Sequence, residues 1–333
     1  MTPTWNRAAY LDRVWNGLNS QTYKHIEWIV ANDGSSDETE LIVRELAARS
    51  GFPVTLITAS VHIGKARMDN ESIAQARGEF ILWNDSDDYL LPHAIEKLVA
   101  TWNSIPEADR TDYVGVTALC AKENGVICST STPTPQMGYF DTTWNDPKNK
   151  LISDVLNLTK SCALKACPFP EVDFVIPEAV TWGTLGDRRV RVLSEALMIK
   201  EYRAPHAISF SGKMEYCRGR AYAIAITDRP LRTDTWSVTT RMWRLITYIR
   251  CSLHGEVSLR DQLLLWADNT TRVNFFMMMP MGYLLALKDR LQGKVRRTHR
   301  EFLVASKQVC ITCTRMGANY AGECHASHRK IGP

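Results

Sequence analysis

Three carboxylates stand within four positions of this chain, at Asp85, Asp87 and Asp88, directly after the apolar residues 80–83. Carboxylates this close repel one another unless water, backbone N–H groups or a cation neutralises them. Mg²⁺ and Mn²⁺ take oxygen ligands of this kind together with substrate phosphates. The alternative is an acidic turn that caps the helix expected from about residue 92. The cluster alone leaves both interpretations open.

A second polar run, residues 32–37, reads Asn-Asp-Gly-Ser-Ser-Asp and follows the apolar residues 26–31. Short apolar runs bounded by turn-forming residues are typical of buried strands. Both polar runs therefore stand at the carboxyl ends of predicted strands, where ligands gather in open α/β sheets. We expect the two runs to lie on the same rim of one sheet.

The elements between these runs alternate between short strands and amphipathic helices. Apolar residues recur at helical spacing near the N-terminus: Leu11, Val14, Trp15 and Leu18. Asn6 is placed to cap that helix, and Ser35 with Glu38 has the spacing of a capping box for the next one. This alternation predicts a doubly wound, mostly parallel sheet with helices on both faces.

The composition of the 333 residues, 45% hydrophobic and 23% charged, is that of an ordinary soluble protein. Residues 288–300 contain six basic residues and one acid. Their net charge of +5 exceeds the net charge of the whole chain, which is +4. The main body is therefore nearly neutral, which argues against nucleic acid as a partner. Residues 2–20 lack the apolar run of a signal peptide, and the 9 Cys are scattered, so we expect a cytoplasmic protein with reduced thiols.

Several elements in order resemble the N-terminal half of the family 2 glycosyltransferases. They are Thr2-Pro3-Thr4-Trp5-Asn6-Arg7, Gln21-Thr22-Tyr23, Asn32-Asp33-Gly34-Ser35, Ala76-Arg77-Gly78-Glu79 and the acidic cluster. The resemblance is dense over residues 2–92 and thinner to about 205. It implies an α/β fold of the GT-A type, with a GT-A-like doubly wound, mostly parallel sheet and a C-terminal helical appendage.

The resemblance also implies a nucleotide-sugar site. Asp33 matches the Asp before Gly-Ser that hydrogen-bonds the nucleotide base, commonly uracil, and Thr2 and Pro3 match residues that line the base and ribose. Arg67 lies in a segment that supplies a cation near the diphosphate. The alternatives are that Asp33 caps the following helix and that Arg67 is a solvated helix residue.

In the same family the DxD motif contacts the ribose and holds a divalent metal. Asp85 and Asp87 match this motif, and Asp88 extends it. We expect Asp85 and Asp87 to bind the nucleotide sugar, and Asp87 and Asp88 to hold Mn²⁺ or Mg²⁺. A metal here would neutralise the charge that develops on the departing diphosphate.

Inverting sugar transfer needs a base against the attacking hydroxyl. Glu178 is the candidate, because residues 168–186 resemble the family segment that carries an acidic pair before a helix. This chain has Glu178-Ala179 where the family often has Glu-Asp. Asp173 and Glu171 are the fallbacks, and an exposed Glu that favours a helix N-terminus is the alternative.

We expect four consecutive segments: residues 1–110 as the nucleotide-sugar half, 111–230 as the acceptor half, 231–305 as a helical region and 306–333 as a tail. The tail contains the side chains of a zinc site, namely Cys310, Cys313, Cys324, His325 and His328. A disordered tail is the alternative.

The apolar residues 275–287 are too few to span a bilayer, which takes about 20 residues. Pro280 and Gly282 interrupt them, and the basic residues 288–300 follow. This segment either lies in the membrane interface and attracts anionic lipid, or packs in the core beside a solvated basic helix.

The sequence thus predicts a metal-dependent, inverting transferase that moves one sugar, UDP-sugar being the favoured donor, to a glycan or lipid-linked acceptor in polysaccharide biosynthesis. It would work in the cytoplasm, with a peripheral contact at the inner face of the membrane. The chain lacks the Gln-x-x-Arg-Trp motif of processive members. The rivals are a nucleotidyltransferase and a nucleotide-sugar-binding protein without turnover, since the apolar first strand of the family is missing before Thr2.

Overall fold

The computed structural model describes residues 1–128, 138–144, 154–202, 216–227, 237–264, 269–293, 308–317 and 324–330. The chain forms two compact units that interleave along the sequence. The first comprises Met1–Glu171, Leu185–Ala204 and Leu303–Pro333, and the second comprises Val172–Thr184 and Pro205–Phe302. The predicted α/β class is confirmed, because helices pack on two sheets within the first unit.

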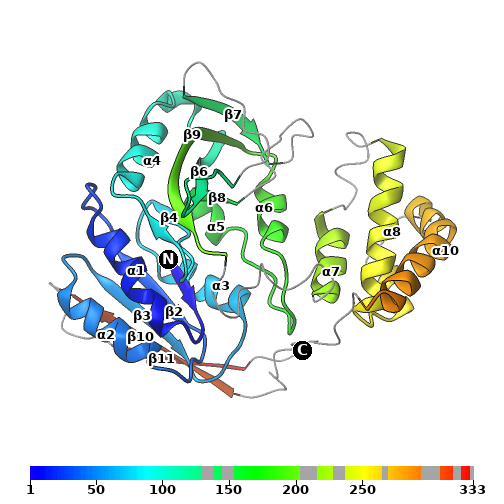
Figure 1. The fold of residues 1–333 in the computed structure, drawn as a ribbon, viewed down its shortest axis with the longest axis horizontal. Coiled ribbons are helices and arrows are strands. Elements are labelled where there is room, and N and C mark those ends of the chain that lie inside the picture. Colours follow the sequence, from blue (N-terminus) through cyan, green and yellow to red (C-terminus); the bar gives the residue numbers. More distant parts are fainter. Residues whose placement is uncertain are drawn as a thin grey trace. The chain divides into compact units, whose positions relative to one another are not determined.

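The first sheet has five strands in the order β1-β2-β3-β10-β11 (Figure 1). They are β1 (Thr2–Thr4), β2 (Trp28–Asn32), β3 (Val54–Ala59), β10 (Gln308–Met316) and β11 (Cys324–Lys330). The first three are parallel, whereas β10 runs antiparallel to both β3 and β11. The C-terminal tail therefore extends the sheet that carries the Asp33 segment.

The strand register of the tail bears on the zinc hypothesis. Cys310 lies opposite His328 along the backbone, and Cys313 lies opposite His325. Side chains alternate along a strand, so Cys310 and Cys313, three residues apart, point to opposite faces of the sheet. The two cysteines of β10 therefore cannot share one tetrahedral site while this strand persists.

The second sheet has the order β4-β8-β6-β9-β5, with β7 paired to β9. Its strands are β4 (Phe80–Leu82), β5 (Tyr89–Leu90), β6 (Tyr113–Lys122), β7 (Tyr139–Thr143), β8 (Val155–Lys160) and β9 (Arg189–Lys200). Only β6 and β9 are parallel here, and the other pairs are antiparallel. Among the described residues, parallel pairing is thus limited to β1–β2–β3 and β6–β9, and the sheets are more mixed than the alternating pattern predicted.

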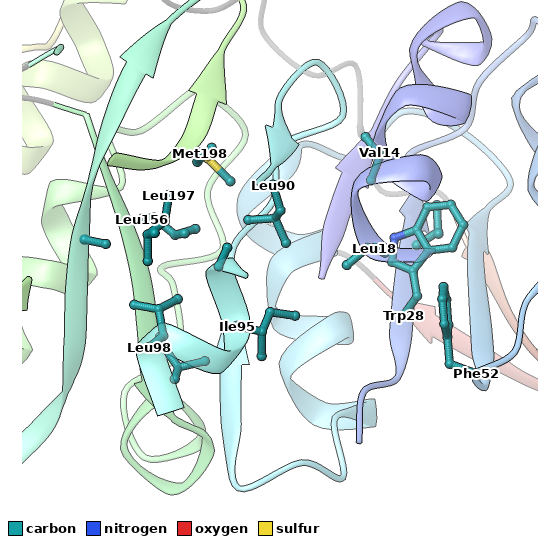
Figure 2. Close-up of a cluster of buried hydrophobic side chains, with 14 of the residues drawn as sticks. Val14, Leu18, Trp28, Phe52, Leu90, Ile95, Leu98, Leu156, Leu197 and Met198 are labelled. Carbon is teal, nitrogen blue, oxygen red and sulfur yellow. The ribbon is translucent and has the colours of Figure 1, made fainter. Parts of the chain in front are cut away.

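The helices of the first unit bury their apolar sides against these sheets. They are α1 (Ala8–Asn19), α2 (Thr39–Arg49), α3 (Lys65–Gln75), α4 (Ala94–Asn103) and α5 (Ser161–Lys165), whereas the short 3₁₀ turn η1 (Glu107–Asp109) buries no residue. Figure 2 shows Val14 and Leu18 of α1 beside Trp28 of β2, and Leu98 of α4 beside Leu156 of β8. The predicted apolar face of α1 is confirmed. This continuous core holds the strand ends on which the polar loops stand.

Both predicted helix caps were wrong. Asn6 has a positive φ of 52°, and its side chain accepts a hydrogen bond from Ser36 N instead of capping α1. Asp37 provides the contacts expected of the caps: its carboxylate accepts from Ala8 N at 3.1 Å and from Thr39 N at 3.1 Å. One carboxylate therefore serves the first turns of both α1 and α2, and it fixes their two starts together.

The second unit is helical. Its helices are α6 (Ala179–Leu185, whose last residue falls in the first unit), α7 (Cys217–Thr227), α8 (Val238–His254), α9 (Leu259–Leu264) and α10 (Asn269–Leu291). The core lies between α7, α8 and α10, where Tyr248 and Phe275 are fully buried. Pro280 lies within α10 and does not end it. No helix among the described residues is long and apolar enough to cross a membrane.

Candidate functional site

The two polar loops flank the N-terminal strand from opposite sides. Asp33 N, just after β2, donates to Thr4 O at 2.9 Å, and Asn84 N, just after β4, donates to Met1 O at 3.0 Å. The Met1 ammonium also donates to Leu82 O at 2.7 Å. Residues 32–37, called here the Asp33 loop, and residues 84–88, the acidic loop, therefore begin on either side of β1. The prediction that the two runs lie on the rim of one sheet is wrong in detail, because β2 and β4 belong to different sheets and the loops meet only through the N-terminal residues 1–4.

Asp33 is buried, at 4% exposed, and binds the segment that precedes α3. Its Oδ1 accepts from Ile63 N at 2.6 Å, and its Oδ2 accepts from Gly64 N at 2.9 Å and lies 2.9 Å from His62 Nδ1. The carboxylate does not cap α2, so that alternative is wrong. The His62 ring stacks on Trp5, with ring centroids 4.4 Å apart. Asp33 thus holds a stacked aromatic pair in place, and its contact with a base stays a prediction.

Gly34 in the Asp33 loop has a structural reason to be glycine. Its φ is +65°, in the left-handed region that side chains disfavour. A Cβ atom at this position would also lie 2.6 Å from His62 N, which is far too close. The Asn-Asp-Gly-Ser run therefore packs directly against the backbone before α3.

The acidic loop is neutralised by side-chain cations. Arg7 Nη1 lies 3.2 Å from Asp87 Oδ2. Lys200, the last residue of β9, places Nζ 3.2 Å from Asp85 Oδ2 and 2.6 Å from Asp88 Oδ2. Asp88 Oδ1 also accepts from Glu201 N at 3.0 Å. The interpretation of this cluster as a cap for the next helix is wrong, because α4 begins after His93 without a side-chain cap.

The electrostatics of the cluster follow from burial and Lys200. Burial acts to raise the pKa of Asp85, but the charges of Lys200 and Lys65 and the hydrogen bond from Lys200 together outweigh it and lower that pKa to about 2. Burial raises the pKa of Asp88 to about 7 against the Lys200 charge, with Asp85 adding to the rise. Burial and the Asp85 charge also raise the pKa of Asp87. Two of the three carboxylates would therefore gain from further positive charge.

Arg7 and Lys200 are the residues that the sequence did not assign. Arg7 stands in a recognised motif but carries no predicted role. Lys200 lies 115 residues after Asp85. The apolar pattern of residues 192–202, which contain Lys200, fits either a strand or a helix, so nothing in the spacing indicates a contact with the acidic loop. The strand β9, which pairs with β5 just after the loop, brings Lys200 to the cluster.

The other predicted donor-site residues also lie near β1. Thr2 is fully buried, and its Oγ1 accepts from Trp28 Nε1 at 2.9 Å. Pro3 pairs with Ala31 in the sheet. Arg67, on α3, is 4% exposed and donates from Nη1 to Ile63 O at 3.0 Å, so it is not a solvated helix residue. Contacts of these residues with a nucleotide sugar stay predictions.

The candidate bases lie where the two units join in the sequence. Glu171, at the end of the first unit, accepts from Asn70 Nδ2 through Oε1 at 3.2 Å. Asp173 and Glu178 belong to the second unit. The Glu178 carbonyl accepts from Thr181 N at 3.1 Å, in the first turn of α6. The position of Glu178 relative to the acidic loop stays a prediction.

The predicted metal ligands differ in how well they suit an ion. Asp87 has one side-chain cation partner and is 16% exposed, so its carboxylate suits a divalent metal. Asp88 is 2% exposed, and its two oxygens contact Lys200 and Glu201 N. It suits a metal once Lys200 releases Oδ2. Within the part of the chain that the structure describes, no ready-made group of three or more His, Cys, Asp or Glu ligands is present.

Comparison with known proteins bears on these arrangements. Residues 1–161 match the sequence model of a family described as Glycosyl transferase family 2. Over 126 residues the chain is 31% identical to an uncharacterized glycosyltransferase of Rickettsia prowazekii, which covers 38% of each protein. Over 103 residues it is 31% identical to the GalNAc(5)-diNAcBac-PP-undecaprenol beta-1,3-glucosyltransferase of Campylobacter jejuni, covering 31% of this chain and 33% of that protein. The chain spans about a third of the length of the curated relatives it matches.

Among solved structures, the fold is similar to that of S. aureus TarS 1–349 in complex with UDP-GlcNAc. The TM-score is 0.52 at 17% identity, covering 88% of this chain and 82% of that one. At this identity the similarity concerns the fold alone. It confirms the predicted GT-A-like class.

Proposed function

Because residues 1–161 match the sequence model of the family 2 glycosyltransferases, we propose that the chain moves a single sugar from a nucleoside-diphosphate sugar to a hydroxyl of a glycan or lipid-linked acceptor. One observation carries the proposal: the Asp33 loop and the acidic loop begin on either side of β1. The Asp33 loop would then bind the base of the donor, and the neighbouring acidic loop would bind its diphosphate. UDP-sugar is the favoured donor, since Asp33 matches the uracil-contacting residue of the family.

In this proposal Asp33, Thr2 and Pro3 receive the base and ribose. The stack of His62 on Trp5 supports the base position, because flat rings offer an aromatic base a surface to stack on. Arg67 stabilises the diphosphate from the first turn of α3, and Asp85 and Asp87 contact the ribose side of the donor. Each group is held by the core before the donor arrives, which lowers the entropy lost on binding.

Asp87 and Asp88 would hold Mn²⁺ or Mg²⁺. The ion would neutralise the charge on the departing diphosphate. Arg7 holds the carboxylate of Asp87 in position, and Lys200 neutralises Asp88 before the donor binds. Glu178 takes the proton from the acceptor hydroxyl at its carboxylate, which fits an inverting transfer.

The acceptor would be a glycan or lipid-linked glycan of polysaccharide biosynthesis. The reaction would take place in the cytoplasm, at the inner face of the membrane when the acceptor is lipid-linked. The similar enzyme of Campylobacter jejuni carries undecaprenol in its name, which supports a lipid-linked acceptor.

Calorimetry with a panel of nucleoside diphosphates, with and without Mn²⁺, tests the donor site. We expect one nucleotide to bind more tightly with Mn²⁺, because the ion would neutralise the negative charge of the diphosphate. Asp87→Ala and Asp88→Ala should each lose the metal-dependent part and keep the rest. Unchanged metal-dependent affinity in both variants would refute the assignment.

Glu178→Gln separates a transferase from a protein that only binds the donor. Loss of a general base costs roughly 10²- to 10⁴-fold in rate, so we expect normal donor affinity with transfer reduced by about that factor. Asp173→Asn tests the fallback base and should keep its transfer rate, whereas loss of transfer in this variant alone would assign the base to Asp173. Full transfer by Glu178→Gln eliminates it as the base, and donor binding without any transfer in the wild type supports the binding-protein alternative.

A further inference from the structure

Helix α10 has an inner apolar side that packs on α8. The ring of Phe275 meets Tyr248 edge to face, with centroids 6.3 Å apart. Gly282 allows the close approach of the two helices, since a Cβ there would lie 2.5 Å from Ile249 Cγ2. Asp289 fixes the C-terminal end by pairing with Arg250 Nη2 at 2.5 Å and His254 Nε2 at 3.1 Å. The orientation of α10 about its own axis is therefore set by these contacts.

The opposite side of α10 is also apolar, and it is exposed. This outer face consists of Val273, Phe276, Met277, Pro280, Leu284, Leu287 and Leu291. These residues recur every three or four positions, so they form one stripe along the helix. Apart from the proline, each is between 51% and 81% exposed. A helix that is apolar on both sides is normally buried or in contact with lipid.

The charges beside the outer face have one sign. Lys288 and Arg290 are exposed near its C-terminal end, whereas Asp289, the only acid of α10, is buried in its contacts with α8. Basic side chains around an apolar stripe attract a negatively charged surface.

One large aromatic side chain borders the outer face. Tyr283 of α10 neighbours Pro280 and Leu287 at helical spacing and is 61% exposed. Trp and Tyr prefer the boundary between acyl chains and headgroups, because each has an apolar ring with a polar group. The outer face is therefore bordered by an aromatic and by basic side chains, as helices that lie in a membrane interface are.

We propose that the outer face of α10 binds the surface of a bilayer that contains anionic phospholipid, with the helix axis parallel to that surface. The seven residues of the face enter the headgroup boundary, and Lys288 and Arg290 contact lipid phosphates. The proposal does not depend on the sugar or on the transfer reaction, because it rests on the second unit alone.

Flotation of the full chain with vesicles tests the proposal. We expect binding to vesicles of phosphatidylcholine with phosphatidylglycerol, and much weaker binding to phosphatidylcholine alone. Leu284→Gln with Leu287→Gln should reduce partitioning by about 100-fold, since two large apolar side chains no longer enter the boundary. Lys288→Gln should reduce it by about fivefold.

The matched control is Leu41→Gln with Val126→Gln, which changes two equally exposed apolar residues of the first unit. It should float like the wild type, and equal flotation of both double variants overturns the proposal. Sedimentation and thermal unfolding test other occupants of the face. A dimer that the α10 double variant disrupts without a change in flotation assigns the face to a second copy. A lower Tm in that variant than in the control assigns the face to packing within the chain, which also overturns the proposal.

Discussion

The Asp33 loop and the acidic loop differ in what neutralises their carboxylates. Each follows a strand, fully buried in β2 and partly buried in β4, and both begin beside β1. In the Asp33 loop, Asp33 and Asp37 accept hydrogen bonds from backbone N–H groups. In the acidic loop, Asp85, Asp87 and Asp88 contact the side-chain cations Arg7 and Lys200.

This difference indicates that the two loops have different roles. Backbone N–H groups belong to the fold, so carboxylates that bind them hold chain segments together and leave only when those segments move. Side-chain cations sit on flexible stems, and a metal ion or the substrate can replace them without unfolding anything. We infer that the Asp33 loop is mainly a rigid support and that the acidic loop is the part that exchanges its partners during binding.

Asp33→Ala should have the largest effect on stability. It removes the acceptors of Ile63 N and Gly64 N, which are buried contacts. An unsatisfied buried donor costs about 1–3 kcal/mol, so we expect the free energy of unfolding to fall by about 3 kcal/mol. Urea unfolding followed by circular dichroism measures the change.

Two variants decide whether the comparison holds. Asp33→Asn keeps one acceptor oxygen and should lose about half as much stability, roughly 1.5 kcal/mol. Asp87→Ala should lower the free energy of unfolding less than Asp33→Ala does, because the lost contact with the buried Arg7 is partly offset by relief of the burial and the Asp85 repulsion that raise the pKa of Asp87. The comparison fails if Asp87→Ala is as destabilising as Asp33→Ala.

The sequence predicted the polar loops of the site better than the contacts that hold them in place. The polar loops, their strands and their family resemblance were visible because each lies within a few residues of a strand end. Gln21 in the Gln-Thr-Tyr motif is an example of what stayed hidden. Its amide is fully buried and donates to Gly17 O and Leu91 O while accepting from Ile95 N, so it anchors the chain that leaves the acidic loop.

Pairings between distant segments could not be predicted for a physical reason. Lys200 reaches Asp88 only because β9 pairs with β5 and β6, and the local pattern of that strand also fitted a helix. Likewise, β10 pairs with β3 across about 250 residues, and the local sequence pattern of a strand does not indicate which distant strand it pairs with. The caps failed because Asp37, which lies between the two predicted capping residues Ser35 and Glu38, takes both helix starts.

Lys200→Met should have the next largest effect, on metal affinity rather than on stability. In the wild type an incoming ion competes with Lys200 Nζ for Asp85 and Asp88. Without the ammonium group this competition ends, so we expect Mn²⁺ to bind about tenfold more tightly, equivalent to about 1.4 kcal/mol. Calorimetric titration of the nucleotide-free protein with Mn²⁺ measures this without any transfer assay.

The control for Lys200 is Lys97→Met, which removes a lysine paired with Glu195 on the exposed surface. It should leave Mn²⁺ affinity unchanged. If Lys200→Met weakens Mn²⁺ binding as Asp87→Ala does, Lys200 supports the metal site instead of competing for it. The acidic loop would then be as fixed as the Asp33 loop.

Asp37→Ala should have the smallest effect, although Asp37 serves two helices. The side chain is exposed, so water can replace it at Ala8 N and Thr39 N, and the loss of a helix cap costs about 1 kcal/mol.

Burial acts to raise the pKa of Asp37, but hydrogen bonds from Thr39 and Ala8 N together outweigh it and lower that pKa. A lowered carboxyl pKa stabilises the fold above the unfolded value, near about 4, and the contribution is lost as the pH falls below it. Urea unfolding at neutral pH should therefore show the deficit of Asp37→Ala, and unfolding at low pH should show a smaller one. A deficit that stays constant as the pH falls would mean that the charge of Asp37 adds nothing to its hydrogen bonds, and Asp37→Asn would then match the wild type at every pH.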